Sequence, residues 1–363
     1  MRAGSFLVAV AIGVASAVSF ASGARAEVVK TLRAELPAEA AARFGVENLV
    51  GRMRVSAADQ PGVIVTATVY GENDELAGAV RIERVTESGG PLLRVRYPYD
   101  RVRTFRYHEP DSDWDGAFLG FASSSTYHYD GRTVRVNPGR GTLLHADLEV
   151  VVPRRGLQAL FRNLVGRLEA EGLEGRLGFE VESADLRLAR LKGDLVLKGS
   201  SGDIRARDIQ GDWRSEFSSG DCRLEDFSGE SLSFRATSGD MVGRRIRARH
   251  LRSDTSSGDV RLLDAEVEEL AVEATSGDIE FESAAKGLRS AEIRTSSGDV
   301  LLRLPENAGF DLETSQSSGD TRIGYADAAS LHQDGHHATY RRGGGGAHIR
   351  VRTSSGDLTV RPL

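Results

Sequence analysis

Eight aspartates of this 363-residue chain end the tetrapeptide Ser/Thr-Ser-Gly-Asp, which recurs between Ser200 and Asp357. Each carboxylate could accept backbone and hydroxyl hydrogen bonds at a tight corner, or a stacked column of them could bind Ca²⁺. The calcium-binding pattern Gly-Gly-x-Gly-x-Asp is absent, which favours the corner role. The predicted corner residues are Gly202, Asp203, Gly220, Asp221, Gly239, Asp240, Gly258, Asp259, Gly277, Asp278, Gly298, Asp299, Gly319, Asp320, Gly356 and Asp357.

Three further aspartates, Asp111, Asp113 and Asp115, match the opening of an EF-hand calcium loop, with Gly116 at its sixth position. The acid expected at the twelfth position is missing, because Ala122 stands there. A solvated acidic turn is therefore the favoured interpretation, and a calcium site is the alternative.

The segment 328–346 carries His332, Asp334, His336 and His337 at a spacing that metal ligands use. It lacks strand alternation and ends in four glycines, so we expect a flexible loop inserted in one coil. Metal ligands need a rigid element to hold them, which such a loop does not supply. We therefore predict no metal site and no cofactor.

Aromatic and arginine side chains are concentrated in residues 97–129, the least regular part of the chain. Such a loop either binds a ligand or caps the end of a repeat stack. Exposed rings beside arginines would suit the rings and carboxylates of an acidic polysaccharide, whereas in a cap the same rings would pack the core. The candidate ligand-binding residues are Tyr99, Arg103, Arg106, Tyr107, Trp114 and Tyr127.

Catalytic constellations are missing from the sequence. There is no Gly-x-Ser-x-Gly motif, no zinc motif and no convincing set of nucleophile, base and acid. The one cysteine, Cys222, lies within a strand-like stretch and is more typical of a small core or surface residue than of a nucleophile. We predict a protein that is not an enzyme. A polysaccharide lyase or hydrolase is the alternative, since β-helices can host clustered carboxylates.

The elements that position the corner residues are short repeated strands. Successive tetrapeptides lie 18 to 21 residues apart until the last, which follows after 37, and a near-constant period is the signature of a solenoid. Between them apolar and charged residues alternate, as at Leu270, Val272 and Ala274, which indicates strands with one buried face. The prediction is an all-β fold: a β-solenoid with coils of about 19 residues.

The amino-terminal part reads as strands separated by Gly, Asp and Pro turns. Its segment Asn48-Leu-Val-Gly-Arg52 is echoed by Asn163-Leu-Val-Gly-Arg167, so we expect it to contain a related coil or to cap the stack. The predicted organisation is a signal peptide at 1–26, a β-rich cap at 27–162 that includes the 97–129 loop, and a solenoid at 163–363.

The amino terminus has the pattern of a secretory signal peptide: Arg2, an apolar run from Phe6 to Phe20, and Ala24-Arg25-Ala26 as a cleavage site. The run is short for a membrane span, and a retained anchor is the alternative. We therefore expect export to the periplasm, cell surface or medium, with no transmembrane segment in the mature chain. A net charge of −6 argues against nucleic-acid binding.

The leader, the stretch Val46 to Val55 and the run of Ser-Gly-Asp coils together resemble the bacterial putative-adhesin family, a domain of unknown function built of β-strand repeats in cell-envelope proteins. The resemblance implies a fold rather than an activity or a set of binding residues. The predicted secretion, the regular stack and the charged outward positions favour a non-catalytic envelope protein that acts as an adhesin or binds a surface polymer, such as a polysaccharide. A periplasmic scaffold or envelope-stress sensor with a protein partner, recruited at an exposed strand edge, is the alternative.

Overall fold

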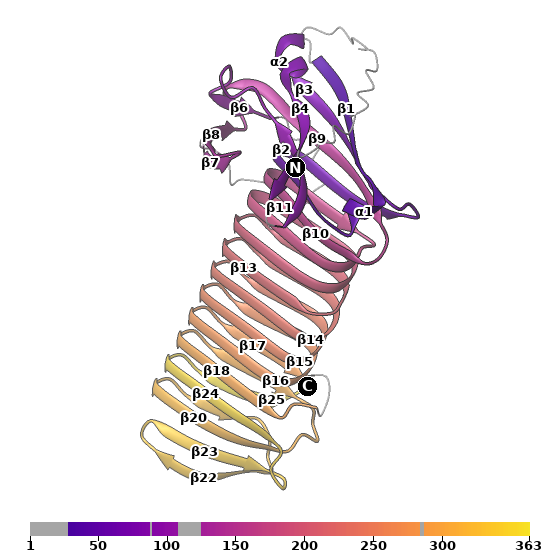
Figure 1. Ribbon diagram of the computed structural model, residues 1–363. Coiled ribbons are helices and arrows are strands. Elements are labelled where there is room, and N and C mark those ends of the chain that lie inside the picture. The colour runs from indigo at the N-terminus through magenta and orange to yellow at the C-terminus, as the bar shows by residue number, and fades with distance from the viewer. Residues whose placement is uncertain (1–27, 88, 108–124, 284–286) are drawn as a thin grey trace, which may run out of the picture. The chain divides into compact units, whose positions relative to one another are not determined.

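The computed structural model describes residues 28–87, 89–107, 125–283 and 287–363 (Figure 1). Contacts within the chain divide it into two compact units, Met1–Ala184 and Asp185–Leu363. The predicted leader at 1–26 lies outside the described residues. Apart from two short helices, the regular elements of both units are β-strands, and the prediction of an all-β fold is confirmed.

The first unit combines parallel and antiparallel strands around the buried strand β2. Val46, Leu49, Val50 and Met53 of β2 have no exposed surface. Strand β2 pairs in parallel with β5, β9 and β10, while β3 pairs antiparallel with β1 and β9. The elements are β1 (Val28–Leu36), α1 (Ala38–Ala41), β2 (Arg43–Ala58), β3 (Val63–Gly71), α2 (Asp74–Ala79), β4 (Arg81–Glu87), β5 (Gly90–Arg96), β6 (Thr104–Arg106), β7 (Ser125–Tyr129), β8 (Arg132–Asn137), β9 (Thr142–Pro153), β10 (Leu157–Glu171) and the first part of β11 (Glu174–Ser201).

The two echoed segments of the first unit lie side by side. In the parallel pair β2 and β10, Asn48 faces Asn163 and Gly51 faces Gly166. The Asn48 amide donates to Asn163 Oδ1 at 3.0 Å, and the Asn163 amide donates to the Gly51 carbonyl at 2.9 Å. Both asparagines are fully buried, so their repeated position is explained by an amide ladder that satisfies buried polar groups.

The second unit is a stack of coils with parallel strands in continuous register (Figure 1). This confirms the predicted β-solenoid. Its elements are the rest of β11, β12 (Ile204–Gln210), β13 (Trp213–Ser219), β14 (Cys222–Ser238), β15 (Met241–Ser257), β16 (Val260–Ser276), β17 (Ile279–Ser283), β18 (Ser290–Ser297), β19 (Val300–Leu304), β20 (Phe310–Ser318), β21 (Thr321–Ile323), β22 (Ala328–Asp334), β23 (His337–Arg342), β24 (Ala347–Ser355) and β25 (Leu358–Pro362).

Left-handed backbone positions mark the corners of each coil. The glycines of the tetrapeptide have φ between 109° and 138°, a region that favours glycine. A second column of corners lies further along the coils and consists of non-glycine residues with φ of 53° to 56°: Arg190, Asp208, Asp226, Arg245 and Asp264. The corners direct alternate side chains inward, so one buried column is formed by Leu195, Trp213, Leu232, Leu251 and Leu270.

The last coil in sequence is not the last coil in space. Strand β24 pairs with β18 on one side and β20 on the other, and β25 pairs likewise with β19 and β21. The coil that ends the chain therefore lies between two coils that precede it. This placement explains why the final tetrapeptide follows after 37 residues while still occupying an ordinary corner of the stack.

Residues 328–346, which the sequence predicts to be a flexible loop, contain two strands. Strands β22 and β23 form an antiparallel hairpin, and β23 pairs antiparallel with β20. Most side chains of β22 are exposed, so the hairpin has no apolar alternation by which the sequence could reveal it. Its pairing depends on the backbone of β20, which lies distant in sequence.

We expect the substitution Gly258→Val to lower the free energy of unfolding of the second unit by about 3 kcal/mol or more. Gly258 has φ +133°, and a Cβ there would lie 2.2 Å from the Gly239 carbonyl oxygen. Urea unfolding followed by circular dichroism measures the change. The control Gly335→Ala, which meets no atom within 4 Å, should stay within about 0.5 kcal/mol of wild type. Equal effects of the two substitutions would contradict the corner assignment.

Candidate functional site

The corner aspartates form a continuous ladder of hydrogen bonds. In each rung one carboxylate oxygen accepts the backbone N–H of the aspartate in the next rung, at 2.8 to 3.1 Å. The order in space follows the coils, so Asp357 lies between Asp299 and Asp320. The members are Asp185, Asp203, Asp221, Asp240, Asp259, Asp278, Asp299, Asp357 and Asp320. These hydrogen bonds agree with the corner interpretation, and the structural role of the individual carboxylates stays a prediction.

Arginines compensate part of the negative charge along this ladder. Arg261 forms ion pairs with Asp240 and Asp259, and Arg322 with Asp320 and Asp357. Within the part of the chain that the structure describes, no three His, Cys, Asp or Glu side chains are grouped to hold a metal ion. The incomplete EF-hand residues Asp111, Asp113 and Asp115 lie outside that part, so the calcium alternative for them stays a hypothesis.

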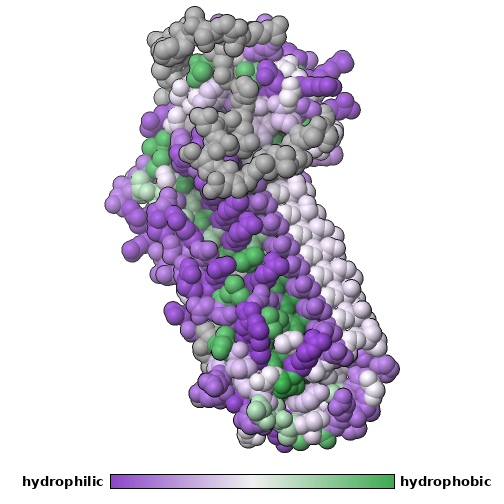
Figure 2. Space-filling view, turned by 180° about the vertical axis from the view of Figure 1, so that it is seen from behind, coloured by the Kyte–Doolittle hydropathy of each residue, from purple (hydrophilic) through white to green (hydrophobic). Residues whose placement is uncertain are grey.

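The residues before the ladder expose two columns of hydroxyl groups. The exposed members include Ser218, Thr237, Ser256 and Thr275, and the pale, straight edge in Figure 2 has the colour of serine, threonine and glycine. Beside them is a shallow groove of about 570 Å³, lined by charged side chains such as Glu216, Arg235 and Asp254 as well as by these hydroxyls. Three of its charges are already paired: Arg235 lies 3.7 Å from Glu216 and 3.3 Å from Asp254.

The aromatic residues of the first unit pack against one another. Tyr97 contacts Phe105 with ring centroids 5.4 Å apart, and Tyr99 and Tyr129 complete the cluster at 6.2 to 6.5 Å. Burial raises the pKa of the Tyr97, Tyr99 and Tyr129 hydroxyls. These phenols therefore stay protonated and cannot serve as bases near neutral pH.

The predicted ligand-binding residues do not form one exposed surface. Tyr107 and Tyr127 are only 4% and 6% exposed, so their rings cannot offer faces to a sugar, and for these two the capping interpretation is the better one. Arg103 is exposed, while Tyr99 and Arg106 are half-buried. Their ligand-binding role stays a prediction. Trp114 lies outside the described residues.

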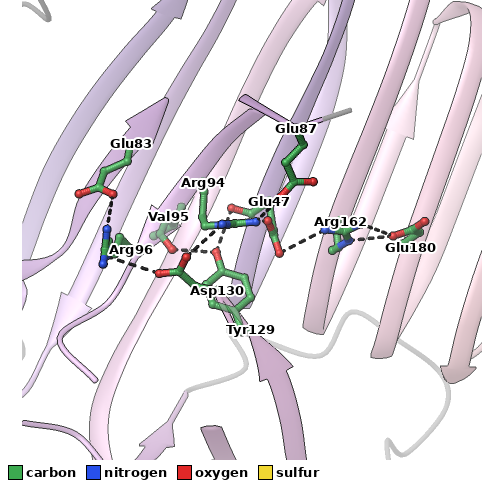
Figure 3. Close-up of polar contacts among 10 residues, drawn as sticks. All are labelled: Glu47, Glu83, Glu87, Arg94, Val95, Arg96, Tyr129, Asp130, Arg162 and Glu180. Carbon is green, nitrogen blue, oxygen red and sulfur yellow. Dashed lines mark hydrogen bonds and ion pairs between the residues drawn. The ribbon is translucent and has the colours of Figure 1, made fainter. Parts of the chain in front are cut away.

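Next to the aromatic cluster lies a network of ion pairs that the sequence did not reveal (Figure 3). Arg94 donates to Glu47 at 2.7 Å, to Asp130 at 3.0 Å and to Glu87 at 2.7 Å. Arg162 lies 3.4 Å from Glu47 and also pairs with Glu180. The side chain of Glu47 is 4% exposed and that of Arg94 14%, so both charges are withdrawn from water.

This network has the features of a structural element. Tyr129 donates to the carbonyls of Val95 and Glu47, which ties the cluster of rings to the ion pairs. Burial opposes the charge of Arg94, but its bonds to Glu47 outweigh that effect and raise its pKa. The carboxylates of Glu47 and Asp130 are both paired with the Arg94 guanidinium. The residues come from β2, β4, β5, β10, β11 and the β7–β8 turn, and no spacing in the sequence brings them together.

The single cysteine is also unsuited to catalysis. Cys222 is 1% exposed, and burial raises the pKa of its thiol to about 12. The reactive thiolate is therefore not formed near neutral pH. Cys222 fills a core position between Ile204 and Met241 of the neighbouring coils, as the sequence predicts.

These features define the class of protein: a β-solenoid whose repeated carboxylates stabilise its own corners. Residues 182–361 match the model of the Toastrack DUF4097 family, so this part of the chain is similar to Toastrack DUF4097 domains. The expected resemblance to an adhesin-type domain of unknown function is thereby confirmed. Among the described residues, no helix has the length and apolar character needed to cross a membrane.

Two solved structures are similar over most of their length. A putative cell adhesion protein from Clostridium sporogenes shares 8% identity with a TM-score of 0.20, and the match covers 92% of this chain and 100% of that one. A putative lipid binding protein from Parabacteroides distasonis shares 10% identity with a TM-score of 0.39, covering 91% and 96%. Both TM-scores are low, so neither similarity carries an argument about function. No curated protein matches the chain.

We expect the substitution Arg94→Gln to destabilise the first unit by about 3–5 kcal/mol, because it leaves the buried Glu47 carboxylate without its nearest cation. Urea unfolding of the full chain measures the loss. The control Arg101→Gln removes an ion pair with Glu75 in which both side chains are more than half exposed, and should cost under about 1 kcal/mol. Similar losses for both variants would show that the network contributes no more than a surface pair.

The carboxylate of Asp357 should make the second unit sensitive to acid. The Asp320 N–H lowers the pKa of the Asp357 carboxyl, and Arg322 lowers it further, against the opposing effect of partial burial. A folded pKa below the unfolded value contributes stability above the unfolded pKa, and this contribution is lost as the pH falls through the folded pKa. Stability should thus decrease below about pH 4, and Asp357→Asn should flatten that decrease.

Thermal unfolding across this pH range tests the prediction. The control is Glu306→Gln, which removes an exposed carboxylate outside the ladder. If Asp357→Asn lost stability at low pH as steeply as the wild type, Asp357 would not contribute to the acid sensitivity.

Proposed function

We propose that this chain is an exported, non-catalytic protein of the cell envelope that binds a surface polymer, as an adhesin does. The observation that carries the proposal is that the repeated carboxylates form hydrogen bonds with the backbone of neighbouring coils. Each corner aspartate except Asp320, the last in the ladder, accepts a backbone hydrogen bond from the next rung, which supports a role of these acids in the fold rather than in a reaction. A hydrolase or lyase would instead need a local set of groups with shifted pKa values.

The outer surface of the coils supports binding to an extended partner. Outward side chains repeat from rung to rung in straight rows, because the parallel register places equivalent residues one above another at about 4.8 Å. A repeating polymer could contact several equivalent positions at once, and many weak contacts on one ligand add up to useful affinity. The predicted leader supplies the route to the envelope.

A second candidate function, a scaffold for a protein partner, is favoured by one strand. Strand β22 pairs only with β23 on one side among the described residues, and Leu331 within it is 53% exposed. An unpaired edge of this kind can accept a strand from another chain. The edge is short, however, and its Ser330/His332 register shift interrupts regular pairing, so polymer binding remains our main proposal.

Co-sedimentation of the full chain with purified envelope polysaccharides and with whole cells tests the proposal, with released sugar assayed in the same tubes. We expect retention in the pellet without release of sugar. Release of sugar would overturn the non-catalytic assignment. Binding to cells but to none of the polysaccharides would favour the scaffold instead, and loss of that binding on deleting residues 328–342 would place the partner at the hairpin.

A further inference from the structure

One side of the second unit holds arginines in adjacent rungs. Arg187 of β11, Arg205 of β12 and Arg223 of β14 occupy the same position in three successive coils, two residues after the aspartate ladder. Arg207 and Arg244 lie two residues further along their strands, in the neighbouring row. We call these five residues the arginine face: Arg187, Arg205, Arg207, Arg223 and Arg244.

The acids near this face compensate it only in part. Arg205 lies 4.0 Å from Asp203 and Arg223 lies 3.7 Å from Asp221, long distances compared with the two bonds of 2.6 and 2.9 Å between Arg245 and Asp226. Burial lowers the pKa of Arg205, and the neighbouring Arg223 and Arg187 lower it as well, against the effect of Asp203. Like charges in adjacent rungs repel each other.

Two members of the face have no acidic partner. Glu225 stands between Arg207 and Arg244 in register, but its carboxylate is turned to Arg245, 3.6 Å away. As a result, neither Arg207 nor Arg244 has a carboxylate within 4.0 Å among the residues described by the structure. Both side chains are exposed, so their guanidinium groups are available to an external anion.

Other stretches of the same unit alternate in sign from coil to coil. Lys198, Glu216, Arg235 and Asp254 follow one another in successive coils, and Arg249 lies between Glu230 and Glu268 at 2.7 and 3.7 Å. The fold can therefore place opposite charges in adjacent rungs. In the row of Arg187, Arg205 and Arg223 it does not, because three arginines follow one another in adjacent rungs.

Apolar side chains interrupt the same two rows. Val242 follows Arg223 in register, and Leu263 follows Arg244; both are half-buried. Figure 2 shows apolar and strongly polar groups interleaved beside the pale edge of the stack. A surface of guanidinium groups and apolar patches fits a ligand that has both carboxylates and ring faces.

We propose that the arginine face binds a linear polysaccharide carrying carboxylate groups, with the guanidinium groups of successive rungs contacting carboxylates along the chain. This inference rests on the polymer-binding function proposed above and adds the ligand class and the contact surface. Arginine is suited to the role because its planar fork forms two parallel hydrogen bonds with a carboxylate.

The test compares two double variants of the full chain that lose the same charge. In the first, Arg207→Gln and Arg244→Gln remove the two unpartnered members of the face. In the matched control, Arg247→Gln and Arg249→Gln remove two exposed arginines of the same unit that pair with Glu266 and Glu230. Thermal unfolding of each variant verifies that the fold is intact. The probes are polygalacturonate and neutral dextran, with binding measured by calorimetry at two salt concentrations.

We expect polygalacturonate to bind the wild type more tightly at low salt, the face variant to bind about tenfold more weakly, and the control to stay within about a factor of two. Equal losses in both variants, or equal binding of dextran, would overturn the inference. Binding of phosphatidylglycerol vesicles but not of polygalacturonate would overturn it in favour of a membrane ligand. If the chain sediments with envelope polysaccharides while the face variant binds them as wild type does, the inference fails and the proposed function stands.

Discussion

The hydrogen bond from each corner amide to the aspartate of the preceding rung is the contact on which the solenoid depends. A sharp corner leaves backbone N–H groups that cannot join the strand ladders, and buried donors of this kind are costly when unpaired. The Ser-Gly-Asp sequence supplies both remedies: glycine adopts the left-handed backbone, and the carboxylate accepts the amide of the next coil. Because a carboxylate accepts the backbone N–H of the neighbouring coil, this hydrogen bond can form only when coils are stacked.

The corners also fix the register between neighbouring coils. This register determines which side chains lie next to one another on the surface. With one coil directly above the next, inward residues form continuous core columns and outward residues form charge rows. Where the rows alternate in sign, they hold neighbouring coils together. In the row of Arg187, Arg205 and Arg223 they repeat one sign, and this row is part of the surface for which we propose an anionic ligand. Stability and recognition thus derive from the same repeated geometry.

In the first unit, buried backbone polar groups are satisfied by different side chains. Its buried asparagines Asn48 and Asn163 form a ladder of amides in place of carboxylates, and Glu47 and Arg94 neutralise each other where they are withdrawn from water. Neutral amides suit this position because they satisfy buried backbone carbonyls without a net charge. The tyrosines around them pack as a core, and their hydroxyls reach backbone carbonyls at its margin.

The sequence alone determined the repeat, the corners, the alternation of buried and exposed residues and the echo of Asn48 in Asn163. These are local or periodic properties, and they follow from the conformations of glycine and the spacing of apolar side chains. Only the tertiary structure decided which coil lies beside which. The insertion of β24 and β25 between earlier coils, the hairpin on β20 and the meeting of Glu47 with Arg94 and Asp130 all join residues far apart in the chain. Such contacts depend on the packing of whole elements in space, which no spacing along a single sequence records.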